Sequence, residues 1–151
     1  MKRFNFSLQK VLDYREFEKK QAQAELGKAV SVETNIQNTL NMIAESRAKS
    51  VQETDKMRDL NSLYNAGLYF QLLNQRRDEM LEELAKAKIV TNEKRKVMIE
   101  AMKNVKVLET LKEHRIEAWK HEQLRIEDDQ IDDIVTSRYS FAEPLVSASS
   151  D

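Results

Sequence analysis

The sequence predicts an all-α protein, a long antiparallel hairpin of two helices that pack as a coiled coil and are followed by a disordered C-terminal tail. Ala, Glu, Lys, Leu and Arg supply 69 of the 151 residues, which is typical of coiled coils and long helices. The chain has only two glycines and one proline, too few for the many chain reversals of a sheet-rich fold. Apolar residues also recur at alternating spacings of four and three, the period of a coiled-coil seam.

Composition also limits the class of function. Leu, Ile, Val and Phe make up 38 residues, more than the roughly 20% below which a chain is expected to be disordered. The absence of cysteine excludes disulfides, thiolate metal sites and cysteine nucleophiles. A net charge of −1 and a pI near 6.2 argue against nucleic-acid binding. No signal peptide or membrane span is evident, so we expect a soluble, unsecreted protein that does not insert into a membrane.

The first helix is predicted at about residues 7–57. A side chain that suits an N-cap, Ser7, stands just before the first seam residue. Most positions of the predicted seam are apolar, as packing against a second helix requires. The register runs through Leu8, Leu12, Arg15, Lys19, Ala22, Leu26, Ala29, Glu33, Ile36, Leu40, Ile43 and Arg47.

The reversal is predicted at about residues 58–67. Asp, Asn and Ser are frequent there and compete for local backbone hydrogen bonds. Gly67, at the end of this stretch, is suited to a positive φ angle. A single reversal places the two helices side by side and antiparallel.

The second helix is predicted at about residues 68–138, and its seam again contains cations, which weaken packing. The predicted register comprises Leu73, Arg77, Met80, Leu84, Ala87, Thr91, Lys94, Met98, Ala101, Val105, Leu108, Lys112, Arg115, Trp119 and Ile126. Flanking residues are expected to widen the apolar stripe, namely Leu81, Val97, Leu111, Ala118, Ile131 and Ile134. Cations on a seam must extend to water or meet a carboxylate, so this seam suits a mobile or partner-dependent rod.

The last residues differ from the rest of the chain. Residues 139–151 lack periodicity and contain Pro144, which predicts a flexible tail. Residues 1–30 carry a net charge of +3 and residues 121–151 carry −6. An antiparallel hairpin would bring these oppositely charged ends near each other.

No residue pattern indicates catalysis, a cofactor or a metal. His114, Glu117 and His121 share a helix face, but no fourth ligand is indicated, and a solvated face explains them. The acidic cluster at Glu127, Asp128, Asp129, Asp132 and Asp133 lacks the glycine of a calcium loop. Either a basic partner or plain solvation accounts for this cluster.

A group of bulky residues begins the second helix, at Tyr69, Phe70, Leu72 and Leu73. They spread around more than one helix face, so one narrow seam does not use them all. Two interpretations remain open, packing of the hairpin tip and an exposed patch that binds another protein. Trp119 is expected to be buried against the hairpin or a partner.

Three stretches of the sequence together resemble those of a known family. The first is the opening string Phe4-x-Phe6-Ser-Leu8-Gln-Lys-Val11-Leu12-Asp-Tyr14-Arg15-Glu16, followed by Glu18 and Ala24-Glu25-Leu26. The second is Tyr69-x-x-Leu72-Leu73 with Met80, and the third is Asp132-Asp133-Ile134 with Arg138. These stretches resemble the FliJ family of flagellar export proteins. The length and the predicted hairpin agree with this resemblance over nearly the whole chain.

The resemblance implies a non-enzymatic, stalk-like component of the flagellar type III export apparatus that also acts as a chaperone-escort factor. Its implied partners are the hexameric export ATPase, the cytoplasmic domain of the export gate protein and export chaperones. Its implied place is the cytoplasm, at the periphery of the inner membrane at the flagellar base. By position, Leu8, Leu12, Arg15 and Glu16 would face the ATPase, and Tyr69, Leu72 and Leu73 would face the gate. Without the resemblance, a generic coiled-coil adaptor or spacer is the leading interpretation.

Overall fold

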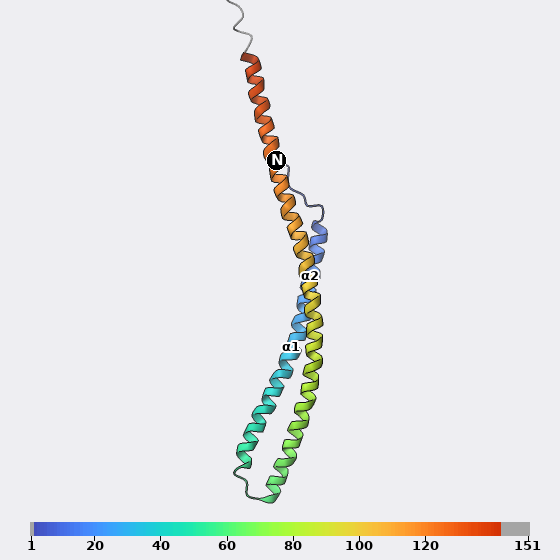
Figure 1. Ribbon diagram of the computed structural model, residues 1–151, viewed down its shortest axis with the longest axis vertical. Helices are drawn as coiled ribbons and strands as arrows, with labels where there is room; N and C mark the ends of the chain where they lie inside the picture. Colours follow the sequence, from blue (N-terminus) through green and yellow to red (C-terminus); the bar gives the residue numbers. More distant parts are fainter. Residues whose placement is uncertain (1, 143–151) are drawn as a thin grey trace, which may run out of the picture. The chain divides into compact units, whose positions relative to one another are not determined.

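A computed structural model describes residues 2–142, and two helices account for nearly all of them (Figure 1). α1 spans Gln9–Thr54, with 46 residues, and α2 spans Leu60–Ala142, with 83 residues. The described residues contain no β-strand. The predicted all-α helical hairpin is therefore confirmed. Of the predicted tail, residues 139–142 belong to α2, and residues 143–151 lie outside the described part.

The chain divides into two compact units, which are described separately. The hairpin unit consists of residues 13–105, and the terminal unit combines residues 1–12 with residues 106–151. Both helices run through the boundaries of these units, so the heptad pattern gives no sign of the division.

In the hairpin unit, α1 and α2 run antiparallel (Figure 1). Two contacts between the helices agree with this direction, because a later residue of α1 meets an earlier residue of α2. Glu25 Oε2 lies 3.9 Å from Lys94 Nζ, and Arg47 Nη1 donates a 2.9 Å hydrogen bond to Asn74 Oδ1.

The turn of the hairpin unit occupies residues 55–59, earlier than the predicted 58–67. Asp59 begins α2: its carbonyl oxygen accepts from the Leu63 N–H at 3.1 Å, and its carboxylate accepts from the Ser62 hydroxyl at 3.3 Å. Aspartate is a preferred residue at a helix start, and here its carboxylate holds the Ser62 hydroxyl of the first turn. The reversal therefore depends on Asp59 and not on Gly67, which lies inside α2 without a positive φ angle.

Replacing Gly67 by alanine is expected to stabilise the protein by about 0.5 to 1 kcal/mol, because glycine is a poor helix former. A Cβ atom added at Gly67 meets no atom within 4 Å, so no clash offsets this gain. Chemical denaturation followed by circular dichroism measures the change. Gly27→Ala is the matched control in α1, where the space is equally open. A loss of stability at Gly67 alone would show that its flexibility is used.

The core of the hairpin unit is a narrow seam rich in small side chains. Its most buried residue is Thr91, 2% exposed, whose hydroxyl donates a 2.9 Å hydrogen bond to the Ala87 carbonyl oxygen. This bond removes the cost of burying an unpaired hydroxyl. The buried apolar residues of the unit are Ala22, Ala29, Ile43, Met80, Leu84, Ala101 and Val105.

The predicted registers agree with burial at most positions and fail at a few. In α1 every register position except Arg47 is buried or half-buried. In α2 the exceptions are Arg115 and Ile126, which are exposed, while Ile116 is half-buried in place of its neighbour. Of the expected flanking residues only Leu111 is half-buried, and the exposed ones are Leu81, Val97, Ala118, Ile131 and Ile134.

The terminal unit packs the N-terminal segment onto α2. The rings of Phe4 and Trp119 meet edge to face, with centroids 6.0 Å apart. Phe6 and Leu12 are buried, 5% and 3% exposed. Lys112 Nζ donates a 2.8 Å hydrogen bond to Gln9 Oε1. We call residues 4–12 and their contacts with α2 the N-terminal clamp.

The contacts of the N-terminal segment with α2 described above are at Lys112 and Trp119, one polar and one aromatic, where an ionic contact between the chain ends was predicted. Within the described part of the terminal unit, no ion pair joins residues 2–12 to residues 121–142. Every residue of α2 from 124 to 141 is exposed, so this stretch has no packing partner within the unit.

Candidate partner-binding surfaces

The residues considered for metal binding lie on open helix surface. His114, Glu117 and His121 are all exposed, and the described residues contain no cluster of metal-type ligands. The acidic cluster at residues 127–133 is exposed as well. Beside it, Arg125 donates a 2.9 Å hydrogen bond to Glu122, and this bond, with the charges of Glu122 and Asp129, raises the pKa of Arg125.

The four residues predicted to face the ATPase belong to different units. Leu12 is buried and Leu8 half-buried in the terminal unit. Arg15 and Glu16 belong to the hairpin unit, where Arg15 donates a 2.9 Å hydrogen bond to Glu18 and Glu16 is exposed. Because Leu12 is only 3% exposed, it cannot contact a partner without leaving its packing. Phe4, Phe6 and Leu12 of the opening string therefore belong to the clamp, whereas Val11 and Tyr14 of the same string are exposed.

The end of α2 exposes an apolar surface in the terminal unit. Acidic residues are interspersed among its large side chains: Glu127 and Asp128 lie three or four residues from Leu124 and Ile131, on the same side of the helix, so this surface is both apolar and acidic. The sequence pattern placed Ile126 on the seam and Ile131 and Ile134 on its flank, but the described part of the unit leaves these three side chains exposed. The exposed apolar residues of this end are Leu124, Ile126, Ile131, Ile134, Val135, Tyr139 and Phe141.

The three residues predicted to face the gate point in different directions. Leu73 is half-buried on the seam, whereas Leu72 is 62% exposed. Tyr69 is partly exposed and lines a cavity of about 600 Å³ beside the turn, together with Met57 and Ala66. Only Leu72 and Tyr69 are therefore accessible to a partner in this conformation.

Leu72 is the last member of a longer exposed row, which we call the outer stripe: Leu60, Tyr64, Leu68 and Leu72. Residues four apart lie on one side of a helix, so the four side chains form a continuous surface. The stretch Leu60–Gln75 also contains no charged residue, in a chain that is 34% charged. Sequence reasoning missed Leu60, Tyr64 and Leu68, although their spacing and the missing charge were visible.

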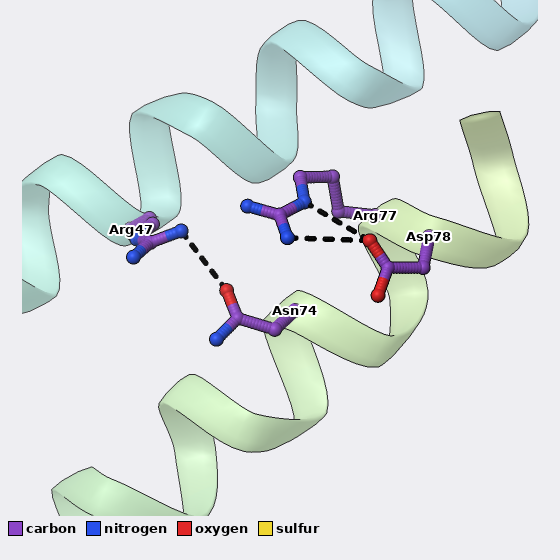
Figure 2. A network of polar contacts seen from close by, with 4 residues as sticks. All are labelled: Arg47, Asn74, Arg77 and Asp78. Carbon is purple, nitrogen blue, oxygen red and sulfur yellow. Dashed lines mark hydrogen bonds and ion pairs between the residues drawn. The ribbon is translucent and has the colours of Figure 1, made fainter.

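One polar contact joins the two helices just beyond the outer stripe (Figure 2). Arg47 reaches from α1 to Asn74 on α2. Arg77 Nε and Nη2 lie 3.3 and 3.2 Å from Asp78 Oδ1 on the same helix. Arg47, a predicted seam residue, is therefore exposed, and it reaches α2 through its bond to Asn74.

Comparison with known proteins gives one match. Searches of curated proteins and of solved structures found none. The family model of the flagellar FliJ protein, however, matches residues 4–143, nearly the whole length of the chain. Its match begins at Phe4 of the N-terminal clamp and includes both helices. The chain belongs to the FliJ family of flagellar export proteins.

Proposed function

We propose that this FliJ-family chain is a non-enzymatic stalk that links the ring of the flagellar export ATPase to the cytoplasmic domain of the export gate protein. Its support is the presence of two separate exposed apolar surfaces, one in each unit. The exposed end of α2 is the apolar surface of the terminal unit, and the outer stripe is the apolar surface of the hairpin unit. Exposed apolar patches of this kind mark protein-binding sites.

Each unit is proposed to make its own contact with the ATPase, the terminal unit through α2 and the hairpin unit through its first residues. The exposed end of α2 supplies contact area, and Glu16 supplies an accessible charge. Leu8 and Leu12 support the contact of the terminal unit by holding the clamp closed, and Arg15 supports that of the hairpin unit through its bond to Glu18. An exposed helix surface that is both apolar and acidic is suited to a partner surface that offers apolar and basic groups.

The proposed gate contact is the outer stripe together with Tyr69, with Leu73 fixing the helix from the seam side. The proposed location is the cytoplasm, at the periphery of the inner membrane at the flagellar base. In the described residues, neither helix has an apolar stretch long enough to cross a bilayer. An escort role for export chaperones belongs to the same proposal, and it would use surfaces left free by the ATPase and the gate.

A pull-down with the cognate export ATPase, combined with an assay of its ATP turnover, tests this function. The purified chain is expected to hydrolyse no ATP, to bind the ATPase and to raise its turnover or its assembly into rings. A chain that neither binds the ATPase nor changes its activity would favour the alternative of a generic coiled-coil adaptor or spacer.

A further inference from the structure

The hairpin unit has two flanks that together form one basic face. Over residues 16–30 the flank of α1 consists of Glu16, Lys20, Gln23, Gly27 and Val30, and over residues 88–102 the flank of α2 consists of Lys88, Asn92, Arg95, Ile99 and Met102; Asp13 and Asp78 lie on the same flanks outside these stretches. Both sets follow the heptad spacing of four and three, so each lies along one side of its helix. All ten residues are exposed. We call this surface, with its three cations and one carboxylate, the basic face.

The position of a cavity shows that these flanks lie on the same side of the hairpin. A cavity of about 480 Å³ is lined by Glu18, Gln21 and Glu25 of α1 and by Val97, Glu100 and Asn104 of α2. Those residues form the flanks on the other side of each seam. The remaining flanks therefore share the opposite side, and the hairpin has one face rich in carboxylates and one face rich in cations.

The cations of the basic face have no carboxylate partner. Within the described residues, Lys20 and Lys88 form no ion pair, and Arg95 donates only to Asn92, at 3.2 Å. Lys96 and Lys103, at the outer edge of the face, are also exposed and without ion pairs. Their charge is therefore available to an external anion.

We propose that the basic face binds the anionic headgroups of a lipid bilayer surface. Clusters of four to eight lysines and arginines on a helical surface typically bind anionic lipid, and the three cations of the basic face make five together with Lys96 and Lys103 at its edge. Most are lysines, whose long stems adapt to a fluid surface. Exposed Val30, Ile99 and Met102 lie between them and can enter the headgroup region. The cations are spread over two helices that lie side by side. A bilayer surface is wide enough to meet cations on both helices, whereas a single acidic peptide is narrow.

This proposal rests on the peripheral membrane location proposed above, and it names the basic face as the surface that contacts the membrane. It does not use the outer stripe or the end of α2. A failure of vesicle binding therefore counts against the basic face alone. A failure of the partner pull-downs counts against the outer stripe or the end of α2.

Co-sedimentation of the full chain with vesicles tests the proposal. We expect binding to vesicles of phosphatidylcholine and phosphatidylglycerol in roughly equal parts, little binding to phosphatidylcholine alone, and loss of binding at high salt. K88Q/R95Q is expected to weaken binding by about 25-fold, since each cation at an anionic membrane contributes about fivefold. K28Q/K86Q is the matched control: it removes the same charge from exposed residues outside the basic face.

Circular dichroism of both double variants confirms that the helices remain. Equal binding to both kinds of vesicle, or equal loss in the two double variants, would overturn the proposal. Binding to polyglutamate that K88Q/R95Q weakens, without binding to vesicles, would also overturn it and would identify an acidic protein as the occupant.

Discussion

Replacing Tyr64 and Leu72 together by alanine is expected to abolish binding to the cytoplasmic domain of the export gate. The two side chains are 69% and 62% exposed, so they are free to act as anchors. Alanine at an interface anchor costs about 2 kcal/mol or more, roughly 30-fold in affinity for each residue. A pull-down or titration with the gate domain measures the loss. The melting temperature should change little, because alanine is a good helix former and no buried contact is removed.

Leu73→Ala is the control for this experiment, since Leu73 is half-buried on the seam one residue away. It should lower stability and affect gate binding much less. If gate binding survives the Tyr64 and Leu72 pair but is lost with Tyr69→Ala, the gate contacts the cavity side of the turn and the outer stripe has another role.

Leu12→Ala is expected to lower the free energy of unfolding by about 2 to 5 kcal/mol, the usual cost of truncating a buried leucine. Leu12 is 3% exposed at the base of the N-terminal clamp. Urea denaturation measures this loss. Val11→Ala is the matched control, because Val11 is the neighbouring residue and is exposed, so its truncation should cost much less.

The same variants separate two roles for Leu12 in ATPase binding. At a temperature where Leu12→Ala is still folded, we expect the loss of ATPase binding to match the fraction of molecules in which the clamp is open. An unchanged free energy of unfolding together with a complete loss of ATPase binding would mean that Leu12 contacts the ATPase directly.

The heptad pattern was sufficient to predict the two helices and most of their seam, because burial in a two-helix hairpin follows directly from spacing. Ala22, Leu84 and Val105 were all placed on the seam and are buried. The start of α2 was missed because Gly67 suggested a turn, whereas the capping bonds of Asp59 begin the helix eight residues earlier than predicted. A glycine in a helix is tolerated when its neighbours propagate the helix.

The binding surfaces were harder to predict because exposure depends on where the partner helix ends. Ile131 and Ile134 continue an apolar pattern, yet no residue of the described terminal unit covers them. Leu72 and Leu73 are adjacent in the sequence, and only the position of α1 decides which of them is exposed. The outer stripe lies off the seam, so a search for seam residues does not find it.

The contact of Phe4 with Trp119 also gives the chain an optical probe of one unit. Trp119 is the only tryptophan in the sequence, and its ring lies against the N-terminal segment. Tryptophan emission therefore responds to the opening of the clamp, whereas far-ultraviolet circular dichroism responds to every helical residue of both units. Where the two signals change at different denaturant concentrations, the separation between them measures how independently the clamp opens from the hairpin.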